Sequence, residues 1–338
     1  MINTTKDNQN TSTSTSGVNA PFYKPEKNGC IVGIGEILWD VFPSGKVLGG
    51  APANFAYHVS QFGLDGRAVS AIGNDEQGDE ILDCLSKKNF RYSIEKTPFP
   101  TGTVQVTLDD KGVPQYEICL KVAWDNIPFT AEMEELARNT TTVCFGSLAQ
   151  RNEASRLTIN RFLDLVPENA LKIFDINLRQ HFYSQELIDH SLSRCNLLKI
   201  NDDEVILVAK LFGWENNSEM EICQKLLSDY SLRMVVLTKG TQGSYVITPN
   251  GTSFKPTPLV EVVDTVGAGD AFTAGFVASL LQGKSIVEAH AMAVEVSAFV
   301  CTQKGAMPVL PESLTGEKDM LSLSNETEPN KKPFEGTV

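Results

Sequence analysis

Residues 264–276, with the sequence DTVGAGDAFTAGF, join a glycine-containing turn directly to an apolar segment of helical character. Small residues let an anion approach the backbone, and the first N–H groups of a helix carry partial positive charge. A carboxylate at this junction repels phosphate, so a functional interpretation gives Asp270 another task, that of accepting a proton from an attacking hydroxyl. The structural alternative is a plain N-cap, because Asp caps helices well and Gly is common in turns. The stretch alone leaves both interpretations open.

A second glycine turn occurs far upstream, in residues 49–63, which read GGAPANFAYHVSQFG. Together the two stretches resemble the two signatures of the ribokinase/PfkB family of carbohydrate kinases. Residues 264–272 match the pattern D-T-x-G-A-G-D-x-F at every fixed position, and residues 49–54 match a G-G-x-x-x-N turn that opens a helix against the sugar. Two long motifs in this order are more specific than either alone. The resemblance covers roughly residues 30 to 312.

The resemblance implies an α/β fold of three layers, α/β/α, with a central and mostly parallel ribokinase-like sheet and a small β-sheet lid. It also implies an enzyme, a phosphotransferase with an alcohol group as acceptor, which moves the γ-phosphoryl group of ATP to a sugar hydroxyl. In that reaction Asp270 aligns the hydroxyl and takes its proton. The backbone N–H groups of Gly267, Ala268 and Gly269 stabilise charge on the transferred group.

Strand-like runs alternate with segments of helical spacing along most of the chain. This alternation by itself predicts a mostly parallel sheet with helices on both faces. The expected strands are Ile31–Ile37, Ala68–Ile72, Val143–Gly146, Lys172–Ile176, Leu197–Ile200, Met234–Leu237 and Ser244–Ile247. Helical spacing occurs in Glu153–Val166, Gln185–Ser193, Glu219–Tyr230 and Ile286–Val300.

Residues 103–120 interrupt this alternation with two runs of alternating residues around the turn-forming segment 109–112. Such a pattern predicts a β-hairpin. The resemblance implies that this hairpin and the strand-like segment Gly45–Leu48 form the lid, at about residues 41–48 and 100–124. A lid over the sugar excludes water that otherwise takes the phosphoryl group. The alternative is a surface hairpin without a role.

Buried carboxylate and amide groups select sugar hydroxyls, because such groups are costly to leave unpaired. The candidate sugar-binding residues, from matches to the family's motifs, are Asp40, Gly49, Gly50, Asn54, Gln105, Asn177 and Arg179. Asp40 has a structural alternative, which is to cap the loop 41–44. Arg179 belongs to a D-x-N-x-R run at the end of a predicted strand, where it either clamps a substrate oxygen or pairs with Asp175.

On the nucleotide side, residues 199–204 (KINDDE) are similar to the family's N-x-x-E motif, and residues 238–243 (TKGTQG) to its T-K-G-x-x-G loop. The resemblance therefore gives as ATP-binding residues Lys199, Asn201, Thr238, Lys239, Gly240, Gly243 and Gly269. Many relatives carry Asn beside the adenine. Here the matching position is Val294, so the adenine contacts are apolar or come from elsewhere.

The resemblance also implies two kinds of metal ion. Glu204 organises Mg²⁺, in the family often through water, and one glutamate is sufficient for an ion that keeps most of its own waters. Asn201 and Glu204 equally fit a helix capping box, and both interpretations can hold together. In relatives, backbone carbonyls beside the anion hole hold a monovalent cation, with K⁺ as the candidate. The corresponding residues are Asp264, Val266, Val300 and Gly305.

Composition narrows the partners to small molecules. The formal net charge is −13, and the chain lacks the clustered Lys and Arg that bind nucleic acid. It also lacks an uninterrupted apolar run long enough to span a membrane. The seven cysteines are scattered without a C-x-x-C pair, which favours free thiols in the reducing cytoplasm. An uncovered lid sheet invites pairing between two copies, so a homodimer through the lid is a further hypothesis.

The predicted domain organisation is a single kinase domain with polar ends. Residues 1–27 are rich in Asn, Thr and Ser and are expected to form a disordered leader, and residues 316–338 a flexible tail. The kinase domain occupies residues 28–315.

Residues 35–43, 49–54 and 146–151 resemble bacterial fructokinases more than ribokinases or nucleoside kinases. The leading hypothesis is thus phosphorylation of D-fructose to fructose 6-phosphate. The alternatives on the same scaffold are ribokinase and 2-keto-3-deoxygluconate kinase. From a different class, the chain could be a non-catalytic, sugar-responsive regulator, although a protein that only binds sugar does not need the proton acceptor Asp270.

Overall fold

The computed structural model describes residues 29–43, 45–108 and 114–316. The predicted leader (1–27), all but the first residue of the predicted tail (316–338) and the turn segment 109–112 lie outside the described residues. No helix within the described ranges is long and apolar enough to cross a membrane. All seven cysteines are free thiols.

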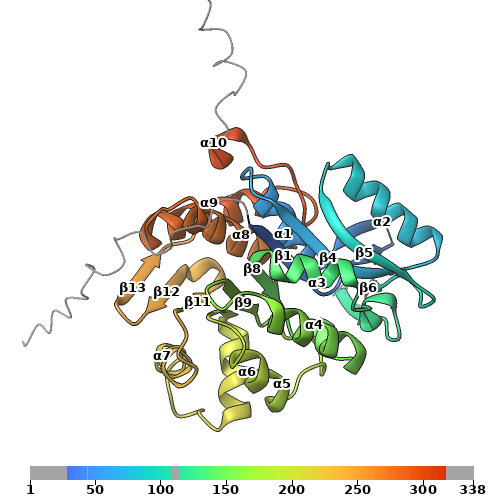
Figure 1. Cartoon of the computed structure of the whole chain (residues 1–338). Helices are drawn as coiled ribbons and strands as arrows, with labels where there is room; N and C mark the ends of the chain where they lie inside the picture. Colours follow the sequence, from blue (N-terminus) through green and yellow to red (C-terminus); the bar gives the residue numbers. More distant parts are fainter. Residues whose placement is uncertain (1–28, 44, 109–113, 317–338) are drawn as a thin grey trace, which may run out of the picture.

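The main sheet has nine strands in the order β13-β12-β11-β10-β9-β8-β1-β4-β5 (Figure 1). From β11 through to β5 neighbouring strands are parallel, whereas β12 and β13 form an antiparallel edge. The strands are β1 (Cys30–Ile34), β4 (Gly66–Gly73), β5 (Arg91–Thr97), β8 (Thr140–Phe145), β9 (Leu171–Asp175), β10 (Leu197–Asn201), β11 (Met234–Thr238), β12 (Ser244–Thr248) and β13 (Gly251–Lys255). The predicted parallel sheet is confirmed, and β5 and β13 extend it beyond the expected strands.

Helices cover both faces of this sheet and complete the three layers (Figure 1). One apolar cluster packs the first face against α3 (Ala131–Arg138), α4 (Glu153–Leu165), α5 (Gln185–Leu192), α6 (Asp202–Phe212) and α7 (Glu219–Asp229). Another packs the second face against α1 (Ala51–Ser60), α2 (Glu76–Lys87), α8 (Ala268–Leu281) and α9 (Ile286–Cys301). The short α10 (Glu312–Thr315) follows.

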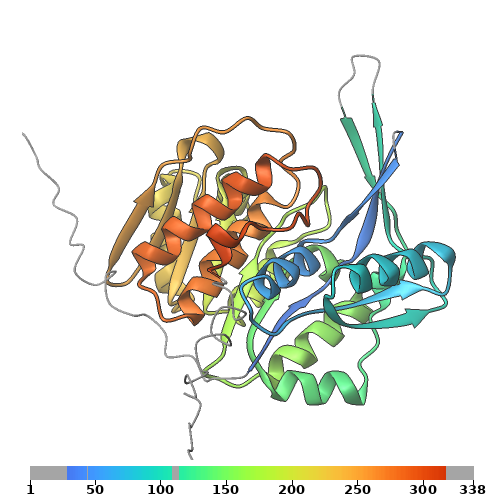
Figure 2. The same cartoon turned by 90° about the horizontal axis from the view of Figure 1, so that it is seen from above.

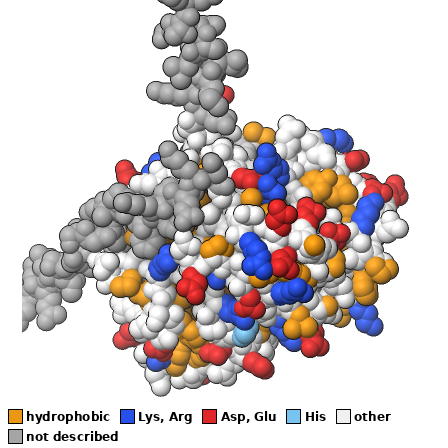
Figure 3. Space-filling model, in the orientation of Figure 1, with side chains coloured by type: hydrophobic (Ala, Val, Ile, Leu, Met, Phe, Trp, Pro, Cys, Tyr) orange, Lys and Arg blue, Asp and Glu red, His pale blue; other side chains and the backbone are white. Residues whose placement is uncertain are grey.

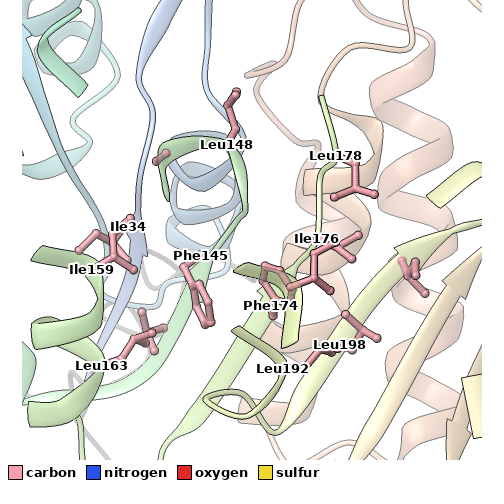
Figure 4. Close-up of a cluster of buried hydrophobic side chains, with 14 of the residues drawn as sticks. Ile34, Phe145, Leu148, Ile159, Leu163, Phe174, Ile176, Leu178, Leu192 and Leu198 are labelled. Carbon is pink, nitrogen blue, oxygen red and sulfur yellow. The ribbon is translucent and has the colours of Figure 1, made fainter. Parts of the chain in front are cut away.

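The cluster on the first face is built from alternate strand residues that point to the same side. Ile34, Phe145 and Phe174 come from three adjacent strands. Ile34 and Phe145 lie toward Ile159 and Leu163 of α4, and Phe174 lies beside Ile176 (Figure 4). The rings of Phe145 and Phe174 stack with their centroids 5.2 Å apart. Because strand side chains alternate between faces, the neighbouring residues of these strands point to α1, α8 and α9. That second face carries the candidate site.

A separate sheet of four strands projects from one end of the molecule (Figure 2). Its order is β3-β2-β6-β7, with β2 (Leu38–Phe42), β3 (Gly45–Gly49), β6 (Thr103–Leu108) and β7 (Pro114–Ile118). The hairpin β6–β7 and the segment at Gly45 therefore belong to one small sheet, as predicted.

The predicted strand Ile31–Ile37 is too long. β1 ends at Ile34, and the chain leaves the main sheet at Gly35, whose φ is +152°. A Cβ on Gly35 would lie 2.8 Å from Pro52, so the turn passes tightly against α1. The next strand, β2, joins the small sheet instead, which places Asp40 in the middle of a lid strand. Apolar residues continue across the junction, so their pattern did not reveal this change of sheet.

Helix α1 lies directly against the main sheet because glycines leave room for its backbone. A Cβ on Gly33 would lie 1.9 Å from the carbonyl oxygen of Pro52, and one on Gly66 2.3 Å from that of Ala56. Contacts under 3 Å with backbone atoms force a shift of the helix or the strand. The sequence therefore needs glycine at both strand positions.

We predict that Gly33→Ala lowers the free energy of unfolding by about 3 kcal/mol, because the added methyl group meets a backbone carbonyl in a packed interior. Urea unfolding measures the loss. Gly283→Ala is the matched control: Gly283 has φ +81° but no neighbour within 4 Å of a Cβ. The Gly283 variant should lose only about 1 kcal/mol of its free energy of unfolding, which is the cost of a residue with a Cβ at positive φ. Equal stability of the Gly33 variant and the parent would contradict the close approach.

Candidate active site

The N-terminus of α8 forms the centre of the candidate site. Its N-cap is Gly267 at φ +77°, without a side-chain cap, and a Cβ there would lie 2.7 Å from Ala306. Asp270 lies within the first turn of the helix, and its Oδ2 accepts a hydrogen bond of 2.8 Å from Nδ2 of Asn54. The capping interpretation of Asp270 is therefore wrong. The first N–H groups of α8 are left without a side-chain cap, as an anion site requires.

Asp270 has the properties of a proton acceptor rather than of an ordinary surface carboxylate. Burial raises its pKa to about 6, and the negative charge of Asp175 acts in the same direction. The hydrogen bond from Asn54 and the positive charges of Lys199 and Arg179 lower the pKa, but they do not cancel the effect of burial. A pKa near neutrality suits a group that takes a proton during a reaction.

The glycines of the upstream signature lie tightly against the segment that carries Glu36 and Asp40. A Cβ on Gly49 would lie 2.6 Å from Oδ2 of Asp40, and one on Gly50 2.3 Å from the carbonyl oxygen of Glu36. Asp40 lies inside β2 in register with Val47, so it does not cap the loop that follows. Burial raises its pKa to about 6. Gly50 is also the N-cap of α1, the helix that carries Asn54.

The loop after β9 brings Asn177 and Arg179 toward the same region. Nδ2 of Asn177 faces Oε1 of Glu36 at 3.5 Å, and Asn177 holds a left-handed φ of 44°. Arg179 donates to the carbonyl oxygen of Leu178 at 3.0 Å. Its positive charge lowers the pKa values of Asp270, Glu36 and Asp40, so it lies among these carboxyls.

The candidate Gln105 lies on β6 of the lid, in register with Val41 of β2. Its Nε2 donates to Oγ1 of Thr103 at 3.3 Å. It is half-buried on the small sheet, adjacent to the strand that carries Asp40.

Glu36 is a site residue that the sequence analysis missed. Its side chain is only 2% exposed, and burial raises its pKa to about 7, with the charge of Asp270 adding to the rise. Oε2 has no hydrogen-bond partner in the described part of the chain. The available signal was its place directly after Gly35 in the run that ends at Asp40. In the sequence, however, it resembled an ordinary polar residue at a strand end.

A buried ion pair lies beneath the start of α8 and takes up Asp175, the alternative partner of Arg179. Nζ of Lys199 is 3.1 Å from Oδ1 of Asp175, so Asp175 pairs with Lys199 and not with Arg179. Thr273 of α8 also donates to Asp175, at 3.4 Å. Nζ of Lys199 would be 3.1 Å from a Cβ on Gly269. The cation therefore adds positive charge directly below the open helix N-terminus.

Glu204 forms the predicted capping box and also accepts a hydrogen bond from the loop after β9. Its Oε2 accepts from the backbone N–H of Asn201 at 2.9 Å, and Oδ1 of Asn201 accepts from Glu204 N at 2.8 Å. Its Oε1 accepts from Leu178 N at 3.0 Å, which ties the Arg179 loop to α6. With both oxygens bonded and the residue 3% exposed, Glu204 fits Mg²⁺ only through an intervening water.

A pocket of about 340 Å³ opens beside the N-terminus of α8. Among its lining residues are the predicted Thr238, Gly240, Gly243 and Gly269. Val294 and a loop with Leu259, Val260 and Val262 make much of its wall apolar, in keeping with the apolar base contacts expected at Val294. Lys239 is directed elsewhere, because its Nζ pairs with Glu219 of α7 at 2.5 Å.

The loops expected to hold a monovalent cation are brought together by Asp264. Its Oδ1 accepts from Val266 N and its Oδ2 from Gly305 N, both at 3.0 Å. The carbonyl oxygen of Val300 accepts from Gln303 N in the turn after α9. These contacts place Asp264, Val266 and Gly305 side by side, whereas the Val300 carbonyl is already used within its turn.

Helix α1 also fixes the turn that faces Gly267. Nε2 of the fully buried His58 lies 2.8 Å from the carbonyl oxygen of Ala306, and since a carbonyl only accepts, the imidazole donates. Burial lowers the pKa of His58 to about 4, so the ring stays neutral.

On the face shown in Figure 3, acidic and basic side chains are interspersed.

Comparisons with known proteins agree with this geometry. The model of the pfkB family of carbohydrate kinases matches residues 40–313. An ATP-dependent 6-phosphofructokinase of Thermoanaerobacterium thermosaccharolyticum is 28% identical over 274 residues, which are 79% of this chain and 83% of that protein. A fructokinase of Salmonella typhimurium is 26% identical over 299 residues, or 82% and 95% of the two chains.

Solved structures are similar over nearly their whole length. A sugar kinase of Pyrococcus horikoshii superposes with a TM-score of 0.71 at 26% identity, covering 82% of this chain and 93% of that one. A fructokinase of Vibrio cholerae, solved with fructose, ADP and a calcium ion, has a TM-score of 0.72 at 24% identity, with 85% and 98% covered. With the site geometry and the family match over most of its length, the chain belongs to the pfkB family of carbohydrate kinases and is a phosphotransferase acting on an alcohol group.

Proposed function

We propose that this sugar kinase transfers the γ-phosphoryl group of Mg·ATP to D-fructose and forms fructose 6-phosphate. One observation carries the proposal: the contact of 2.8 Å between Asn54 and Asp270, which joins the sugar-side signature to a carboxyl of raised pKa at an uncapped helix N-terminus. The adjoining apolar pocket at Val294 is the proposed place of the adenine.

In the proposed reaction Asp270 accepts the proton of the attacking hydroxyl as the phosphoryl group moves. The N–H groups of Gly267, Ala268 and Gly269 stabilise the charge that develops on the transferred oxygens, and Lys199 supports them from below. Mg²⁺ neutralises phosphate charge when it is bound. The lid sheet closes over the sugar and excludes water.

The distribution of charge favours a neutral sugar. Glu36, Asp40 and Asp270 provide three carboxyls around the single guanidinium of Arg179. Such a surface accepts hydrogen bonds from hydroxyls and repels an acid group, which disfavours 2-keto-3-deoxygluconate. Fructokinases in bacteria and plants among the relatives support fructose, while ribose stays the alternative neutral substrate. An intact Asp270 speaks against a non-catalytic regulator.

The remaining proposals concern ions, assembly and location. Asp264, Val266 and Gly305 lie together as a K⁺ site requires, and added K⁺ should raise turnover if their carbonyls bind it.

The lid sheet is the proposed surface of a homodimer, and sedimentation as a monomer would remove that proposal. The free thiols support a reducing compartment, for which we propose the cytoplasm.

We predict that Asp270→Asn lowers kcat with fructose by about 100-fold or more, because the amide cannot take the proton. A coupled ADP-release assay measures turnover over fructose, ribose and 2-keto-3-deoxygluconate. Calorimetric ATP affinity should stay close to that of the parent, which separates loss of chemistry from loss of folding. Retained turnover in the variant would contradict the role of Asp270, and no turnover of the parent on any sugar would favour the regulator.

We predict that kcat/KM for fructose rises with pH through an acid limb near pH 6, where Asp270 loses its proton. The sign follows from the raised pKa: below it Asp270 is protonated and cannot act as a base. Asn54→Ala should move the limb to higher pH, because the lost hydrogen bond stabilises the carboxylate. A limb at the same pH in both proteins would show that Asp270 is not the titrating group.

A further inference from the structure

Glu36 has no assigned role, although its burial is costly. It lies in the loop between β1 and β2, 2% exposed, with one oxygen 3.5 Å from the Asn177 amide and the other without a partner among the described residues. An ionised carboxylate that is buried and half-paired loses its hydration without full compensation by hydrogen bonds. Packing alone therefore favours an apolar side chain here.

The charged and titratable groups around Glu36 come from three elements. The charges of Asp270 in α8 and of Arg179 in the loop after β9 act on the pKa of Glu36, and Glu36 acts on the pKa of the Cys144 thiol in β8. Burial raises the pKa of Glu36 to about 7, the charge of Asp270 raises it further, and Arg179 lowers it. Asp270, with the lower pKa of about 6, is therefore ionised where Glu36 titrates, and its charge keeps Glu36 protonated to a higher pH.

Two amide–carboxyl pairs meet at this place. Asn54 donates to Asp270 at 2.8 Å, and Asn177 faces Glu36 at 3.5 Å through its Nδ2. When the Asn177 nitrogen donates to Glu36, its Oδ1 is free to accept from a sugar hydroxyl. The Glu36 carboxyl thereby determines that the substrate meets the oxygen of the Asn177 amide and not its nitrogen.

We propose that Glu36 is a positioning residue of the phosphoryl-transfer site, which orients the Asn177 amide toward the sugar while the charge of Asp270 acts on it. The inference rests on the proposed function, because it assumes that a sugar binds beside Asn177 and Asp270. Two features of the buried carboxyl can be tested separately, its hydrogen bond with Asn177 and its coupling to the charge of Asp270.

Two substitutions test the hydrogen bond to Asn177. Glu36→Gln keeps the shape and an oxygen for Asn177, so KM for fructose should change little. The acid limb of kcat/KM should stay in place, because Glu36, with a pKa of about 7, is already protonated where Asp270 titrates near pH 6. Glu36→Leu removes the acceptor, and KM for fructose should rise about tenfold, as expected for one lost hydrogen bond. KM for ATP should not change in either variant.

Asp125→Asn serves as the matched control. Asp125 is another buried carboxylate, paired with Arg151 at 2.7 Å and assigned no part in the reaction. Its loss should lower the urea midpoint, which is measured for all three variants, and leave the pH profile in place. If folded Glu36→Leu keeps the parental KM for fructose, or if folded Glu36→Gln raises it as much as Glu36→Leu does, the proposal is overturned.

A measurement without turnover distinguishes this inference from the proposed function. The titration of Glu36 is followed by carbon NMR in the parent and in Asp270→Asn protein. Loss of the neighbouring negative charge should lower the pKa of Glu36, and an unchanged titration overturns the proposed coupling. Absence of turnover on every sugar contradicts the proposed function alone, whereas the NMR result still decides the coupling.

Discussion

The hydrogen bond between Asn54 and Asp270 is the contact on which the site depends. It joins α1 to the N-terminus of α8, and the two residues are separated by most of the chain. The bond exists only because α1 and α8 lie together on one face of the sheet, where Gly33 and Gly66 let α1 approach. On the far side, His58 of the same helix holds Ala306 against Gly267. Helix α1 therefore fixes both contacts, that of Asn54 with Asp270 and that of His58 with Ala306.

The charge balance beneath the site follows from the same layer. Asp175 ends β9 and lies in register with Lys199 of the adjacent β10. Their side chains point to the face that α8 covers, so the ion pair forms under the helix N-terminus. Such a buried pair contributes little net stability, because the cost of desolvation offsets much of the attraction. Its effect is electrostatic, since the Lys199 ammonium stays close to Gly269 while Asp175 raises the pKa of Asp270. The fold thus places a cation and a carboxyl of raised pKa at the N-terminus of α8, as the proposed function requires.

Much of the fold could be predicted because local patterns agree with the tertiary structure. Each expected strand of the parallel sheet contains a buried strand, and the hairpin at Thr103 lies in the small sheet as its alternation indicated. The errors arose where local pattern carries no information on the partner strand. Apolar residues run from β1 into β2 without a break, although the two strands belong to different sheets. In the same way, the predicted Arg179–Asp175 alternative failed because Lys199 on the next strand is closer to Asp175.

The sequence by itself determined the two glycine signatures, the presence of Asp270 beside an anion-binding turn and the alternation that predicts the α/β sheet. These are short-range features, since turn geometry and side-chain period act between neighbouring residues. Only the tertiary structure decided that Asp270 bonds to Asn54 instead of capping its helix, that Lys199 lies below Gly269, and that Glu36 is buried beside Asn177. Burial and charge depend on which distant segments pack together, so the raised pKa values of Glu36 and Asp270 are properties of the fold.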